Sequence, residues 1–287
     1  MWNFNFIEVK SRMIYFNWPK AGFLFLVALL LICCDTIWED RSKCSCYLSL
    51  DLAECRGKSD LLQIWYYNSE DSLVLKDTAD LSNSLFYEAA LPRGLIRYHV
   101  WGGIQNMEVT EESGSKTMIM QIKGREFGPL YRFDGMVNTD CEEAYDAVQL
   151  RKEYAKLGII FKNVPDKFER ALKIRILCGT SGYCTDGTFA EHSTYMESEI
   201  NSNKPVEFIL GRQLSTKKIK LLLFSCSEGD TEEQIGEIEI GEMLFKAGYE
   251  MKEREVKDIE LTIDFSASSI KITVEDWSIT KEVDIEL

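Results

Sequence analysis

Apolar and polar residues alternate with a period of two along most of the chain, which is the pattern of half-buried β-strands. In residues 171–177, for example, the apolar side chains Leu172, Ile174 and Ile176 share one face, and Lys173 and Arg175 share the other. Further runs rich in β-branched and aromatic residues are bounded by turn-forming residues. These expected strands fall at 61–68, 84–91, 95–104, 117–122, 128–135, 205–211, 218–224, 258–265 and 269–274.

Helical patterns are few. Residues 141–156 suggest one or two helical turns, and residues 241–249 predict a short helix closed by Gly248. Strands that recur every 8–12 residues or so, separated by polar turns, are typical of β-sandwiches. The strand rhythm breaks at 138–148, where we expect a boundary between two domains.

The apolar run Phe23–Ile32 is too short for a membrane-spanning helix, which needs about 20 residues. It has the length of a signal-peptide core, for which about 7–15 residues suffice. Three cations precede it, at Lys10, Arg12 and Lys20, as in the basic segment of export signals. The start codon could correspond to Met1 or Met13. Residues 1–33 are therefore predicted to be an export signal.

The end of this run reads Leu31-Ile32-Cys33-Cys34 and resembles a bacterial lipobox. Cys34 as the acylated residue places Leu31 three positions before it and the small residue Cys33 immediately before it. Cleavage between Cys33 and Cys34 would leave a lipid-bearing Cys34 as the new N-terminus, and several acyl chains hold a protein firmly on a membrane. The alternative is a core helix that contains two buried cysteines.

The net charge of −14 argues against a nucleic-acid partner, because proteins that bind nucleic acids are basic. Seven cysteines follow Cys34, and export would permit disulfides. Cys178 and Cys184 flank the sequence GTSGY, which could form a hairpin turn and allow the two thiols to pair. The cysteine spacings match no recurring zinc motif, so we expect neither a metal site nor another cofactor apart from the covalent lipid on Cys34.

Catalytic signatures are weak. Ser181, Asp186 and His192 lie close in sequence, but GTSGY misses the Gly-x-Ser-x-Gly elbow of hydrolases by one residue. The chain is therefore not expected to be an enzyme. Trp65, Tyr66 and Tyr67 could stack on sugar, but aromatic residues in strands more often pack in the core. Trp65 and Tyr67 could share a face, whereas Tyr66 must point the other way.

A lipobox, an acidic segment that ends in LDLAEC and the aromatic run LLQIWYYN together resemble the FimB/Mfa-type fimbrial anchor family of Bacteroidales. The C-terminal part is similar too, with a short helix, Gly248-Tyr249, and a hairpin that starts at Asp258-Ile259 and ends at Asp276-Trp277. The cysteine content is heavier than this family leads one to expect. The resemblance implies two consecutive transthyretin-like β-sandwiches in an all-β protein, expected at 59–145 and 146–287 after a lipid-proximal acidic segment at 34–58.

The resemblance also implies a function. The chain would be an outer-membrane lipoprotein at the base of a fimbrium, where it binds the shaft subunit and limits the length of the fimbrium. Its tail could donate a strand to a neighbouring subunit, or it could be the last strand of its own sandwich. The apolar residues of this tail are Ile279, Val283, Ile285 and Leu287. The alternatives are a surface glycan-binding lipoprotein and a fimbrial tip or adhesin subunit of the same superfamily.

Overall fold

The structure is a computed structural model, which describes residues 44–111, 117–165, 172–200, 204–226, 232–252, 255–266, 269–274 and 277–282. The predicted export signal at 1–33 and the lipidation residue Cys34 lie outside these residues. Strands in five sheets make up most of the described chain, which is an all-β sandwich fold. No helix in this part is long and apolar enough to cross a membrane.

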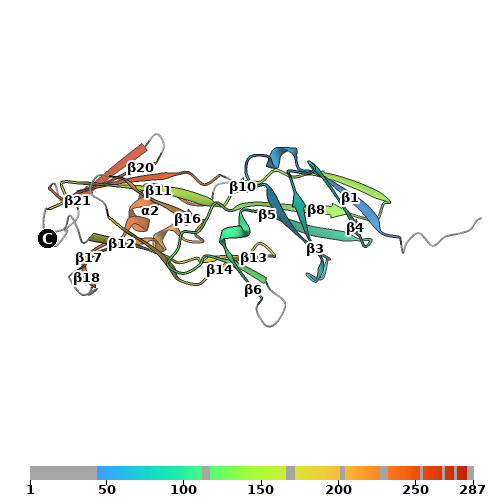
Figure 1. The fold of residues 1–287 in the computed structure, drawn as a ribbon, viewed down its shortest axis with the longest axis horizontal. Coiled ribbons are helices and arrows are strands. Elements are labelled where there is room, and N and C mark those ends of the chain that lie inside the picture. The colour runs from blue at the N-terminus through green and yellow to red at the C-terminus, as the bar shows by residue number, and fades with distance from the viewer. Residues whose placement is uncertain are drawn as a thin grey trace, which may run out of the picture. The chain divides into compact units, whose positions relative to one another are not determined.

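Two sheets built from the N-terminal strands enclose the first core (Figure 1). Sheet 1 has the strand order β4 (Phe86–Leu91), β1 (Cys46–Asp51), β9 (Glu143–Ala147). Sheet 2 has the order β10 (Arg151–Lys152), β8 (Tyr131–Asn138), β5 (Leu95–Gly102), β2 (Leu61–Tyr67), β3 (Leu73–Asp80). In β1, Leu48 and Leu50 are fully buried in the cluster that also contains Ile64 and Tyr98. Burial of such side chains stabilises each by about 1.5–3 kcal/mol relative to exposure.

The aromatic strand β2 sends its side chains to both faces of sheet 2. Tyr66 and its neighbour Ile64 belong to the core between sheets 1 and 2, whereas Trp65 and Tyr67 belong to a separate cluster on the opposite face. This confirms that Trp65 and Tyr67 share a face. All three aromatic side chains are buried, so their role in packing is confirmed, and they cannot form an exposed sugar platform.

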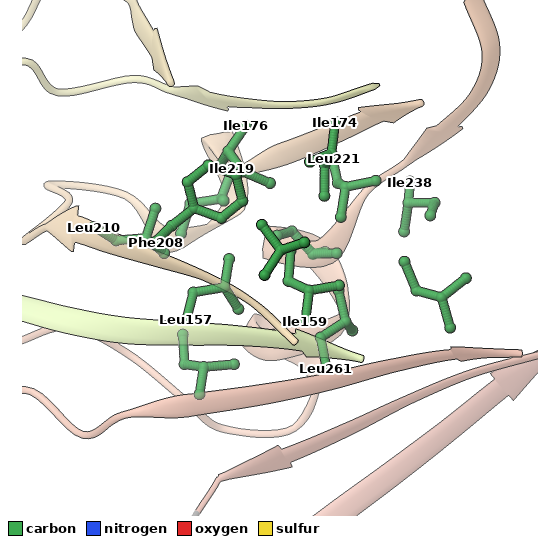
Figure 2. Packing of buried hydrophobic residues seen from close by; sticks show 14 of the residues in the cluster. Leu157, Ile159, Ile174, Ile176, Phe208, Leu210, Ile219, Leu221, Ile238 and Leu261 are labelled. Carbon is green, nitrogen blue, oxygen red and sulfur yellow. The ribbon is translucent and has the colours of Figure 1, made fainter. Parts of the chain in front are cut away.

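Two further sheets from the C-terminal strands enclose the second core. Sheet 4 has the order β15 (Thr194–Glu199), β12 (Leu172–Cys178), β17 (Lys220–Cys226), β18 (Glu232–Ile238). Sheet 5 has the order β16 (Val206–Gly211), β11 (Tyr154–Lys162), β19 (Ile259–Asp264), β20 (Ser269–Val274), β21 (Trp277–Glu282). Figure 2 shows how Ile174 and Leu221 of sheet 4 face Leu157, Ile159 and Leu261 of sheet 5 across this core.

The alternation expected in 171–177 is confirmed. Leu172, Ile174 and Ile176 are buried, while Lys173 and Arg175 on the other face form ion pairs with carboxylates of neighbouring strands. The short helix α2 (Ile240–Lys246) is confirmed as well. Gly248, directly after the C-cap residue Ala247, has φ of +81°, a left-handed conformation that glycine adopts without strain.

Sheet 3 combines strands from distant parts of the sequence. Its order is β14 (Phe189–Ala190), β13 (Gly182–Cys184), β7 (Thr117–Met120), β6 (Glu108–Glu111). A β13–β7 pairing therefore joins the two predicted domains, with Tyr183 opposite Ile119. The described residues also include the 3₁₀-helices η2 (Ala53–Cys55), η3 (Ile104–Asn106) and η5 (Thr216–Lys218).

Two local expectations differ from the structure. The helical turns predicted for 141–156 are wrong, because this segment contains β9, β10 and the start of β11. In β9 exposed residues such as Glu143 and Ala147 alternate with partly buried ones, which is the period of a strand and not of a helix. The segment 34–58, expected to precede the first sandwich, contains β1, which is the central strand of sheet 1. The backbone hydrogen bonds of β1 to both neighbours place it inside the fold; the division into domains stays a prediction.

Candidate functional site

Glu153, between β10 and β11, is enclosed by three hydrogen-bonding side chains. Its side chain is 1% exposed. The hydroxyl of Tyr183 donates to Oε2 at 2.5 Å, Nε of Arg151 donates to Oε1 at 2.5 Å, and Nε of Arg212 lies 2.6 Å from Oε2. Burial and the negative charge of Glu153 raise the pKa of Tyr183 well above its usual range, so the phenol stays protonated.

Backbone hydrogen bonds also connect the residues of this cluster. The Glu153 amide donates to Leu130, and the Arg212 amide donates to the Glu153 carbonyl at 2.9 Å. The guanidinium of Arg212 also donates to the carbonyl oxygens of Met251, at 2.7 Å, and of Lys152, at 3.2 Å. Charge-assisted hydrogen bonds of this kind are stronger than neutral ones. The cluster therefore links the connection between β10 and β11 to the end of β16.

A second carboxylate, Asp134 of β8, sits beside this cluster. Nδ1 of His99 lies 2.6 Å from Oδ1 of Asp134, Nε of Arg132 donates to the same oxygen at 2.6 Å, and Arg151 donates to Oδ2 at 2.8 Å. Burial opposes ionisation of Asp134, but the His99 hydrogen bond and the two arginine charges outweigh it and lower the pKa of Asp134 to about 2. Arg132 in turn lies over the Trp101 ring, 5.1 Å from its centre.

These side chains line a cavity of about 510 Å³. Its wall carries charged and aromatic groups, namely Arg132, Arg151, Arg212, Glu153, Tyr183 and Phe189. Each of the three guanidinium groups bonds to a carboxylate or a carbonyl oxygen of the chain itself. Glu153 accepts hydrogen bonds from Arg151 and Tyr183, forms an ion pair with Arg212 and is buried, which suits a structural ion cluster better than a general base.

The residues of the weak catalytic pattern have other contacts. The Ser181 hydroxyl donates to the Ala190 carbonyl, at 3.4 Å, and lies against the sulfur of Met120. Asp186 accepts hydrogen bonds from the amide and the hydroxyl of Thr188, at 2.9 and 2.7 Å. His192 is exposed. Among the described residues, no group of three or more His, Cys, Asp or Glu side chains is placed to hold a metal ion.

The hairpin expected between Cys178 and Cys184 is wrong, because β12 belongs to sheet 4 and β13 to sheet 3. The two cysteines lie in different hydrophobic clusters, and the structure has both as free, buried thiols. Burial raises the pKa of the Cys178 thiol to about 12. A different pair lies close together, because Cys141 is among the groups that raise the pKa of the Cys46 thiol in β1.

The tail predicted to bind a subunit lies at the edge of sheet 5. Strand β21 is antiparallel to β20, with Ile279 opposite Ile272, and the sheet ends with β21. This pairing makes β21 a strand of its own sandwich in the isolated chain. Val283, Ile285 and Leu287 lie outside the described residues, as do Cys33 and Cys34.

The fold and the buried ion cluster define an all-β sandwich protein in which a shared sheet and a charged junction connect the two halves of the sequence. No protein-family model matches the sequence, and no curated protein matches it significantly. Solved structures do match, and they identify the fold.

The fold is that of the fimbrial anchor protein Mfa2 from Porphyromonas gingivalis, with a TM-score of 0.60, 14% identity, and coverage of 82% of this chain and 99% of that chain. A candidate polysaccharide-binding protein (DUF1812) from Bacteroides thetaiotaomicron matches with a TM-score of 0.60, 14% identity and coverage of 82% and 98%. A candidate adhesin from Bacteroides ovatus matches with a TM-score of 0.57, 13% identity and coverage of 86% and 98%. The shared fold is consistent with the resemblance to the FimB/Mfa-type family.

Proposed function

We propose that this chain is a non-enzymatic fimbrial subunit at the cell surface, and specifically an anchor held in the outer membrane by a lipid on Cys34. The observation that carries the proposal is the fold shared with Mfa2, which extends over 82% of this chain and 99% of that one. The lipobox-like sequence at Leu31–Cys34 supports the proposal, because a lipid there would provide the membrane attachment that an anchor needs. The partners would be the outer membrane, through the lipid, and a fimbrial shaft subunit.

The tail would supply the contact with the shaft subunit. Strand β21 is the last strand of sheet 5, so one of its edges carries backbone groups that can pair with an added strand. Ile279, Val283, Ile285 and Leu287 would then fill alternate pockets of the partner. Replacing Val283 and Ile285 with Asp should abolish capture of the shaft subunit by the purified chain, whereas replacing the neighbouring Asp284 with Asn should not. Equal capture by both variants would mean that the tail serves only its own sandwich.

The lipid tests the anchor role separately. Cys34→Ala should abolish fatty-acid labelling and release the protein from the membrane fraction, whereas Cys33→Ala, which keeps a small residue before Cys34, should leave both unchanged. Labelling that persists in Cys34→Ala and disappears in Cys33→Ala would move the site to Cys33. Labelling of neither wild type nor variant would end the lipoprotein proposal.

Two other functions were open from the sequence. A glycan site on Trp65 and Tyr67 is disfavoured, since both side chains are buried. A fimbrial tip or adhesin subunit shares the fold with an anchor, as the candidate adhesin from Bacteroides ovatus illustrates. Deletion of the gene separates anchor from tip, because only loss of an anchor should release fimbriae into the medium.

A further inference from the structure

We propose that the outward face of sheet 1 binds a neutral glycan. The strand register places nine outward-pointing side chains of this face in three rows across β4, β1 and β9. The inward-pointing side chains of β1, such as Leu48 and Leu50, fill the first core. We call the nine outward positions the sheet 1 platform; they are Ala90, Tyr47 and Glu143, then Glu88, Ser49 and Tyr145, then Phe86, Asp51 and Ala147.

Each of the three strands places one exposed aromatic ring on the sheet 1 platform. Tyr47 of β1 is 60% exposed, and Phe86 of β4 and Tyr145 of β9 are each 62% exposed. Aromatic side chains are large apolar groups that usually lie in cores or interfaces, so three of them on one open sheet face call for a ligand. The outer strands β4 and β9 lie two strand spacings apart, about 10 Å. Rings on both can therefore contact successive residues of one sugar chain.

The space between the rings is lined by hydrogen-bond acceptors. Asp51 accepts a hydrogen bond from the Tyr145 hydroxyl at 3.0 Å, so the Tyr145 side chain extends from β9 toward β1. Glu88 accepts from the Ser49 hydroxyl at 3.4 Å, and Glu143 is exposed at the end of the first row. No lysine or arginine occupies any of the nine positions. Three carboxylates can accept hydrogen bonds from sugar hydroxyls, while the rings contact the C–H face of the sugar.

The same residues argue against other ligands. The negative charges of Asp51, Glu88 and Glu143 repel nucleic acids, anionic lipids and acidic glycans. A second copy of the platform would bring like charges together. The central part of a protein interface is depleted in Asp, Glu, Ser and Ala, and these residue types fill the six platform positions that are not aromatic. A neutral polyhydroxylated chain is the ligand class that suits both the rings and the carboxylates.

The test uses the full-length chain in detergent and measures its retention on immobilised neutral polysaccharides, namely yeast mannan, a plant galactomannan and a β-glucan. Heparin serves as the acidic probe and polylysine as the cationic one. We expect the wild type to bind at least one neutral polysaccharide and not heparin. Removing a ring, in Tyr47→Ala or Phe86→Ala, should weaken binding about tenfold. Tyr145→Phe, which keeps the ring and loses only the hydrogen bond to Asp51, should bind more tightly than Tyr145→Ala.

A matched control removes exposed apolar side chains from sheet 2. Leu73 is 51% exposed and Met136 is 63% exposed, so Leu73→Ala with Met136→Ala should leave glycan binding unchanged. Because all the replaced side chains are exposed, thermal unfolding should be the same for every variant. Failure of wild type to bind any neutral polysaccharide, or equal binding by platform and control variants, would overturn the proposal. Binding to polylysine alone, lost in Tyr47→Ala, would assign the face to a basic protein instead. The fimbrial role is independent of this result.

Discussion

Glu153 and Arg212 form an ion pair that is almost fully enclosed, with 2.6 Å between Oε2 of Glu153 and Nε of Arg212. The pair joins the start of β11 to the end of β16, and Tyr183 of sheet 3 donates to the same carboxylate oxygen. A buried ion pair adds little to stability relative to well-packed apolar groups, but removing one partner leaves a buried charge uncompensated. The cluster is thus a point at which a single substitution has a large effect.

Glu153→Gln should lower the free energy of unfolding by about 3–5 kcal/mol, because Arg212 then remains buried without its counter-charge. Tyr183→Phe removes only a hydrogen bond to a charged group and should cost less, about 1.5–3 kcal/mol. Chemical denaturation measures both. The exposed pair of Lys220 with Glu237 is the control, and Lys220→Gln should change stability little. If Glu153→Gln were as mild as Lys220→Gln, the junction would be held by packing alone.

Asp134 makes the stability of the protein depend on pH in acid. Its pKa is lowered from 3.8 to about 2 in the folded chain, so its ionised form stabilises the fold above pH 4 or so. This contribution is lost as the pH falls through 2. The gap in unfolding free energy between wild type and Asp134→Asn should therefore be constant near neutral pH and shrink between pH 4 and pH 2. A gap that does not change with pH would show that Asp134 is not linked to folding in this way.

Cys46 and Cys141 should form a disulfide on mild oxidation. Burial and the neighbouring Cys141 raise the pKa of the Cys46 thiol, and both cysteines are free thiols in the structure. Oxidation with diamide should link the two, and peptide mapping by mass spectrometry detects the link. Cys141→Ser should abolish it. Cys178, buried in the second core, should remain a free thiol under the same conditions. A disulfide between Cys178 and Cys184 would instead support the pairing that the sequence suggests.

The period of the apolar pattern predicted most of the strands, because strands such as β12 and β19 bury one face only and repeat every two residues. Helix α2 was predicted because Gly248 ends it with a left-handed residue. The segment around Glu143 and Tyr145 was misread as helical. It contains the strand β9, whose pairing partner β1 lies almost 100 residues earlier in the sequence.

The site residues were harder to foresee. Nothing near Glu153 in the sequence indicates that it meets Tyr183 and Arg212, because sheet 3 brings together residues 62 to 66 positions apart through long-range pairing. The sheet 1 platform did leave a signal. Tyr47 alternates with the buried Leu48 and therefore falls on the polar face of β1, together with Ser49 and Asp51. An aromatic residue on the polar face of an alternating strand indicates an exposed ring of this kind.

Deletion of the gene is the decisive experiment for the anchor role, with shaft subunit measured on the cells and in the medium. We expect long fimbriae shed into the medium, cell attachment restored by the wild-type gene, and continued shedding with Cys34→Ala. Fimbriae that stay on the cells at normal length after the deletion would contradict the anchor role.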